Sequence, residues 1–140
     1  MTIAYLDSSA LVKLVVDEDG SDLAGMIWDG CDAAFSSRLA YPEVHAALAA
    51  AARNHQLTKQ QYRGAQQSWK SFWSEMRPVE LTKEVEREAG RLAGVHSLGG
   101  ADAVHLASAL AIGATNLLVA AWDRRLRAGA SAVGLAVAPA

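Results

Sequence analysis

The sequence predicts an α/β fold in three layers, α/β/α, in which helices cover both faces of a mostly parallel sheet. Segments with strand character alternate with segments of helical spacing along the chain. One of them, residues 116–122 (NLLVAAW), is the continuous apolar run typical of a strand inside a parallel sheet. With 140 residues, of which 51% are hydrophobic, the chain is long enough for one domain with a substantial core. We therefore expect a single domain over residues 1–140.

Five segments have the composition of strands. They are short and largely apolar, and in chain order they are 2–6, 33–37, 77–81, 116–122 and 134–139. The first, TIAYL, ends directly at Asp7, and the last, GLAVAP, follows the final predicted helix. The alternation with helices favours parallel pairing of these strands.

Helical spacing predicts seven helices. In chain order they are 8–16, 21–28, a long helix with Pro42 in its first turn, 58–76, 82–95, 101–113 and 123–133. A serine is available to cap the first helix, Thr58 followed by Gln61 fits a capping box, and Thr82 caps the next helix. The segment ADAVHLASAL follows Gly99 and Gly100 and is apolar nearly all round, so we expect this helix to be buried.

Four acidic residues fall where a predicted strand ends or a predicted helix begins, and we call them the acidic quartet: Asp7, Glu43, Asp102 and Asp123. In an open α/β fold such positions gather along one edge of the sheet, where ligands bind. Two carboxylates about 5 Å apart repel by about 3 kcal/mol at an effective dielectric constant of about 20, so a cluster of four predicts bound cations. An all-oxygen ligand set favours Mg²⁺, or Mn²⁺ in its place, over zinc. Such ions activate water for attack on a phosphodiester.

Each acid also has a simpler explanation. Asp7 and Asp123 can cap the helices that follow them, and Glu43 can complement a helix dipole. Asp102 is harder to explain in this way, because it opens a helix that is apolar on every side, where a lone carboxylate needs a partner. The metal site and the capping roles therefore both remain open.

The charge balance excludes nucleic-acid binding through overall charge. The chain has 13 basic and 15 acidic residues and a net charge of −2, so any such binding must be local. Arg124 and Arg127 fall on one side of the predicted helix after Asp123, with Arg125 turned away. They are candidates to hold the phosphates of a substrate, although a solvated helix face is the simpler explanation.

Four segments resemble, in order and spacing, the PIN-domain nucleases, and specifically the VapC-like toxins of bacterial toxin–antitoxin pairs. They are YLDSSALVKL, Pro42-Glu43 before an Ala/Leu-rich helix, ADAVHLASAL and WDRRL. The resemblance implies a PIN-like fold in which the acidic quartet is catalytic and binds metal, with Ser8 or Ser9 as a polar helper beside Asp7. It also implies a Mg²⁺-dependent endoribonuclease that cleaves structured RNA (tRNA or rRNA), a homodimer, and a VapB-like antitoxin that holds the enzyme inactive.

The chain departs from the family pattern at two places. Gly99 and Gly100 stand where an Arg is common before the third acid, and Ala121 stands where a Thr is common before the fourth. These departures leave open a second hypothesis, a catalytically weak PIN-like domain that acts mainly by binding RNA or a partner protein. A phosphatase or response-regulator-like domain is a poor third hypothesis, because Ser9 stands where such phosphatases need a second Asp.

The remaining polar and aromatic residues predict structural roles. His105 lies one turn after Asp102 in an apolar helix, where we expect a core residue with a backbone partner. An aromatic stripe over 62–76 is expected to pack in the core, and the resemblance implies that its helix also helps grip the antitoxin. The single cysteine, Cys31, has no disulfide partner, which favours a cytoplasmic protein. Polar residues interrupt the apolar stretch 104–122, so we expect no membrane span.

Overall fold

The computed structural model of the chain describes residues 1–140. Its strands are β1 (Ile3–Leu6), β2 (Ala33–Ser37), β3 (Arg77–Val79), β4 (Leu117–Ala120) and β5 (Ala136–Ala138). Its helices are α1 (Ser8–Val15), α2 (Ser21–Gly30), α3 (Ala40–Arg53), α4 (Lys59–Glu75), α5 (Lys83–His96), α6 (Gly100–Ile112) and α7 (Arg124–Ala132). All the predicted strands and helices are present, and their ends differ from the predicted ones by a few residues.

The sheet has the order β3-β2-β1-β4-β5, and every neighbouring pair of strands is parallel. The expected "mostly parallel" sheet is thus entirely parallel. The chain runs outward from β1 through β2 to β3, returns to place β4 beside β1, and continues to β5. This reversal makes a topological switch point between β1 and β4. In open α/β sheets, ligands bind outside the carboxyl ends of the strands at such a point.

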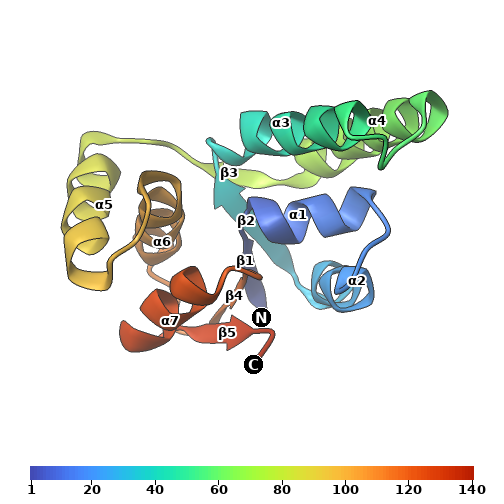
Figure 1. The fold of residues 1–140 in the computed structure, drawn as a ribbon. Helices are drawn as coiled ribbons and strands as arrows, with labels where there is room; N and C mark the ends of the chain where they lie inside the picture. Colours follow the sequence, from blue (N-terminus) through green and yellow to red (C-terminus); the bar gives the residue numbers. More distant parts are fainter.

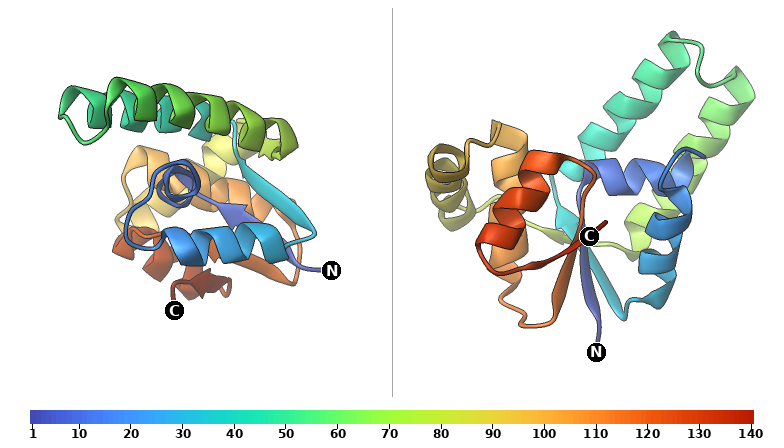
Figure 2. Two further views of the ribbon diagram at one scale, coloured as in Figure 1. Left: turned by 90° about the vertical axis from the view of Figure 1, so that its right-hand side faces the viewer. Right: turned by 60° about the horizontal axis from the view of Figure 1, so that its bottom comes forward.

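Helices cover both faces of the sheet, as Figure 1 shows, which confirms the three-layer fold. Successive residues of β1 alternate between the two cores. Ala4 and Leu6 pack with α1, α3 and α4, whereas Tyr5 packs with α5, α6 and α7. The hairpin of α3 and α4 extends beyond the sheet on one side (Figure 2).

The aromatic stripe of α4 packs against the core, as predicted. Trp69 is fully buried, and Tyr62, Phe72 and Trp73 are partly buried against the same cluster. The predicted capping box also forms, because the Thr58 hydroxyl accepts from the Gln61 amide at 3.1 Å and the Gln61 side chain accepts from the Thr58 amide at 2.9 Å. The capping box therefore determines where this helix starts, and packing of the aromatic stripe against the core determines its orientation.

The helix α6 lies within the layer that covers the second face of the sheet, and it is buried as predicted. Nearly all of the segment from Ala103 to Ala109 is buried, including the polar side chains of His105 and Ser108. No helix in the structure combines the length and the apolar character needed to cross a membrane. The N-terminus of α6, with Asp102 in its first turn, is the end that faces the candidate site.

Candidate active site

The acidic quartet lies at the carboxyl edge of the sheet, at the switch point. Asp7 directly follows β1, and its amide donates to the Ala120 carbonyl of β4 at 3.1 Å, so the ends of the two central strands are joined. Asp123 follows β4, while Glu43 and Asp102 lie in the first turns of α3 and α6. Parallel strands and the helices that follow them thus bring four distant acids to one edge.

Asp7 is buried, with 3% of its surface exposed, and it caps α1. Its Oδ1 accepts from the Ala10 amide at 3.0 Å and from the Ser9 hydroxyl at 2.6 Å. Of the two caps that the sequence offered for this helix, a serine and Asp7, the structure shows Asp7, and the Ser9 hydroxyl donates to Asp7 instead. Capping uses one carboxylate oxygen and leaves Oδ2 without a hydrogen bond, so a cap and a ligand are compatible roles.

The Ser9 hydroxyl also accepts from the Trp122 amide at 3.0 Å. A single side chain therefore joins the end of β1 to the loop that carries Asp123. Of the two serines expected beside the first acid, Ser9 makes these contacts, whereas Ser8 is partly buried and makes no hydrogen bond to Asp7.

Glu43 is held by a histidine from another helix. Its Oε1 accepts from His105 Nε2 at 2.6 Å, and His105 Nδ1 is hydrogen-bonded to the Tyr5 hydroxyl at 2.8 Å. His105 is in the core, as expected, but the expected backbone partner is wrong, because both ring nitrogens bind side chains. The feature of the sequence that indicated a role at the site was the position of His105 one helical turn after Asp102, on the same side of α6.

Asp123 caps α7, and its Oδ1 accepts from the Leu126 amide at 2.9 Å. Asp102 is half-buried and makes no hydrogen bond through its side chain. Burial raises the pKa of Asp102 above its usual 3.8, and the three other acids of the quartet raise it further. Each of the three other carboxylates is therefore close enough to Asp102 to disfavour its charge.

The donor set of this site suits a hard divalent cation. Every free donor is a carboxylate oxygen, and the mutual repulsion favours a positive charge among them. In this structure no three Asp, Glu, His or Cys side chains are arranged to hold one metal ion between them. An ion here would have few direct protein ligands and several water ligands, a coordination that Mg²⁺ commonly adopts.

Comparison with known proteins identifies the family. Residues 4–131 match the family model of the PIN domain. The chain belongs to the PIN-domain family. This PIN domain is 63% identical over 140 residues to Ribonuclease VapC45 and to Ribonuclease VapC49, both from Mycobacterium tuberculosis, with 100% of the chain and 97% of each relative covered. In solved structures, VapBC2 from Rickettsia felis, bound to a DNA fragment from its promoter, has the same fold, with a TM-score of 0.67, 13% identity, and 97% of each chain covered. VapC nucleases with a PIN domain depend on a metal, and VapC toxins pair with VapB antitoxins.

The loop before Asp123 is well held in this PIN domain, although Ala121 has no hydroxyl. The Ala121 amide donates to the Ala138 carbonyl at 3.0 Å, and the Ala121 carbonyl accepts from Arg127 at 3.1 Å. Trp122 packs beneath Lys13, whose ammonium lies 5.0 Å from the ring centroid. These contacts position the loop without the Thr that is common in the family.

Gly20 packs against Trp122 of the same loop, and no other residue type would fit at this position without strain. Its φ is +91°, and a Cβ placed there would lie 2.7 Å from Trp122 Nε1. A side chain at this position would thus strain the backbone and displace the indole beside Asp123.

Without bound metal, the contribution of Asp7 to the stability of the PIN domain should fall as pH rises through the acidic range. Burial raises the pKa of Asp7 above 3.8, an effect that His105 and the hydrogen bonds to Oδ1 reduce. The folded state then holds this proton more tightly than the unfolded state. The stabilisation is complete below the ordinary pKa and is lost as pH rises through the raised one.

The measurement is urea unfolding in chelator, from about pH 4 to about pH 7, for the wild type and Asp7→Asn. The advantage of the variant in the free energy of unfolding should grow with pH. A constant difference would show that the Asp7 charge costs the folded state nothing.

Proposed function

We propose that this chain is the toxin of a toxin–antitoxin pair and hydrolyses structured RNA, tRNA or rRNA, at the acidic quartet with Mg²⁺. The chain is a ribonuclease of the VapC type, as its 63% identity to two VapC ribonucleases over its full length indicates. The observation that supports the assignment of the active site is the raised pKa of Asp102, to which all three other acids contribute. Four segments remote in sequence place these charges together at the switch point of the sheet.

The residues have distinct parts in this proposal. Asp102 and the Oδ2 atom of Asp7 have no hydrogen-bond partner, so they are free to bind the ion. Glu43 and Asp123 complete the negative site, each held by one hydrogen bond at a single oxygen. These carboxylates would hold Mg²⁺, or Mn²⁺ in its place, which when bound would supply an activated water and stabilise the charge on the leaving oxygen.

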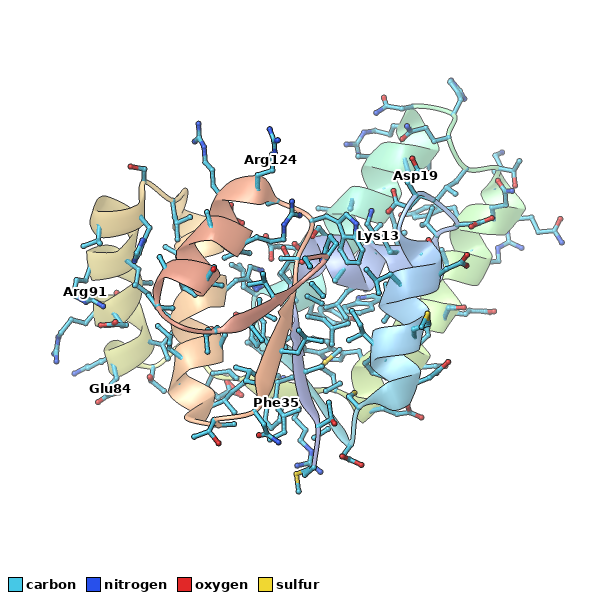
Figure 3. The ribbon with its side chains drawn as sticks, turned by 90° about the horizontal axis from the view of Figure 1, so that it is seen from below. Lys13, Asp19, Phe35, Glu84, Arg91 and Arg124 are labelled. Carbon is cyan, nitrogen blue, oxygen red and sulfur yellow. The ribbon has the colours of Figure 1, made fainter.

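Basic residues beside the quartet are the proposed contacts to RNA phosphates. Figure 3 shows Lys13, on α1, and Arg124, on α7, at the same end of the molecule. Arg124 is exposed and forms no ion pair, whereas Lys13 is paired with Glu18 at 3.5 Å. Arg127 is partly buried and donates to the Ala121 carbonyl. Arg124 is therefore the better candidate of the two arginines, and Arg127 also supports the loop.

Replacing Arg124 with Ala should weaken RNA binding and leave the fold intact. Loss of one phosphate contact lowers the slope of log affinity against log salt concentration by about 1. The measurement is binding to an RNA substrate at several salt concentrations by an inactive variant. Arg125→Ala is the matched control, since Arg125 is an equally exposed neighbour on another side of α7. Equal effects of the two substitutions would argue against a specific contact at Arg124.

The test of the function is cleavage of total cellular RNA by the purified chain with Mg²⁺, with Mn²⁺ and with chelator. Attack by an activated water leaves a 5′-phosphate and a 3′-hydroxyl, whereas attack by the neighbouring 2′-hydroxyl leaves a cyclic phosphate. We expect metal-dependent cleavage with 5′-phosphate ends. Cyclic ends would exclude hydrolysis by the quartet.

A second candidate function is binding of RNA or a partner protein with weak catalysis. The departures from the family pattern at Gly99, Gly100 and Ala121 favour it. Cleavage separates the two candidates, because a binding module would retain RNA without cutting it.

The proposed partners are a VapB-like antitoxin and a second copy of the chain. An arginine of the antitoxin inserted among the carboxylates would replace the metal charge with a bidentate contact. We also propose a cytoplasmic location, supported by a single cysteine that has no disulfide partner. Co-purification with the antitoxin, followed by measurement of the mass of the complex, tests the assembly.

A further inference from the structure

We infer that Tyr5 and His105 are positioning residues that hold the Glu43 carboxylate in its working orientation. This inference rests on the proposed assignment of Glu43 to the active site. We call Tyr5, His105 and Glu43 the polar chain, because two hydrogen bonds, of 2.8 Å and 2.6 Å, connect their side chains one after another. The chain runs from the centre of the sheet, through α6, to the first turn of α3.

The side chains of the polar chain are more deeply buried toward Tyr5 than toward Glu43. The side chain of Glu43 is 25% exposed, that of His105 is 1% exposed, and Tyr5 is fully buried. The carboxylate is therefore in contact with solvent, while the groups that orient it are enclosed by the core. The imidazole also packs edge-on against the Tyr5 ring, with centroids 5.9 Å apart and an interplanar angle of 74°. The ring is thus confined both by packing and by hydrogen bonds.

The donor and acceptor roles fit one arrangement. An ionised carboxylate can only accept, so His105 Nε2 carries the hydrogen that Glu43 accepts. A phenol hydroxyl can donate or accept, so Tyr5 can satisfy Nδ1 whether or not that atom carries a hydrogen. Phenylalanine would fill the same space without holding the ring. The hydroxyl group of Tyr5 is thus the part that determines orientation.

Buried polar side chains such as those of the polar chain contribute less to stability than apolar ones would. The hydroxyls of Ser36 and Ser108 are also buried, and neither has a hydrogen-bond partner. Partly satisfied buried polar groups stabilise a fold less than apolar side chains of similar size. Stability alone therefore does not explain why polar side chains occupy this part of the core. The end of the polar chain that contacts solvent is the Glu43 carboxylate. Orientation of that carboxylate explains the polar side chains.

The test compares Tyr5→Phe, His105→Leu and His105→Gln with the wild type. Residues that orient a metal ligand typically change metal affinity or activity by about 10–100-fold when replaced. We expect losses in this range for His105→Leu and Tyr5→Phe, and partial rescue in His105→Gln, whose amide can still donate to Glu43. Mn²⁺ binding to the RNA-free protein, measured by calorimetry, should weaken in the same order. Leu106→Val, a buried change at the next position of α6, should lower stability without either effect.

A double-mutant cycle separates positioning from general support of the fold. If His105 acts through Glu43, His105→Leu should cause no further loss of cleavage or Mn²⁺ affinity in a Glu43→Ala background. The same additional loss in both backgrounds would overturn the inference. Wild-type cleavage by Glu43→Ala would overturn the assignment of Glu43 itself and the inference with it. An inactive Glu43→Ala beside fully active Tyr5→Phe and His105→Leu would overturn the inference alone.

A spectroscopic measurement reports the state of the His105 ring directly. The ¹⁵N spectrum of the histidine rings should show a protonated Nε2 at His105, and Glu43→Ala should shift that signal. A deprotonated Nε2 would contradict the polar chain as described. The signal is assigned by its loss in His105→Gln.

Discussion

Asp7→Asn should strongly reduce RNA cleavage and leave the fold at least as stable as the wild type. Asparagine retains the side-chain oxygen that accepts from the Ala10 amide and the Ser9 hydroxyl, so α1 remains capped. The negative charge is lost, and with it the attraction for a cation. We expect cleavage to fall on the order of 10³-fold, the scale of removing a group that stabilises transition-state charge. Stability should not fall, because burial already disfavours this charge.

The measurement pairs initial rates of RNA cleavage with urea unfolding of the same preparations. Asp102→Asn should behave in the same way, since burial and its acidic neighbours raise the pKa of that carboxylate too. Asp19→Asn is the control, an exposed acid in the loop before α2 that is labelled in Figure 3. Cleavage at wild-type rates by both Asp7→Asn and Asp102→Asn would place the chemistry elsewhere. Loss of cleavage together with loss of the fold would mean that Asp7 acts structurally.

Chelation should stop cleavage, and restored Mg²⁺ or Mn²⁺ should both reactivate and stabilise the protein. A cation between carboxylates that repel one another binds the folded state selectively, because the quartet is assembled only by folding. At about 100 times the dissociation constant, such binding contributes about 2.7 kcal/mol. For a domain of this size the melting temperature would rise by about 10 °C.

Thermal melts with increasing metal, followed beside RNA cleavage, measure both effects. The double variant Asp7→Asn, Asp102→Asn should show neither the rise in melting temperature nor the recovery of cleavage. Equal stabilisation of this variant would assign the metal to another site. Cleavage that persists in chelator would contradict a metal mechanism altogether.

Much of the fold follows from local chemistry. The apolar segment 116–122 predicted the central strand β4, and Thr58 with Gln61 predicted the start of α4, because caps and buried strands depend on a few adjacent residues. The acids could be grouped from the sequence because each directly follows a strand or opens a helix. In an α/β fold that position alone brings them to one edge.

The sequence by itself determined the alternation of strands and helices, the family, and the approximate meeting place of the acidic quartet. Only the tertiary structure decided which side chains from separate elements meet: Ser9 joins Asp7 to the loop of Asp123, and His105 binds Glu43 and Tyr5 rather than a backbone group. The reason is physical. Periodicity and capping are set by neighbours along the chain, whereas a hydrogen-bond partner is chosen by side-chain direction and distance between packed elements, which exist only after the core has formed.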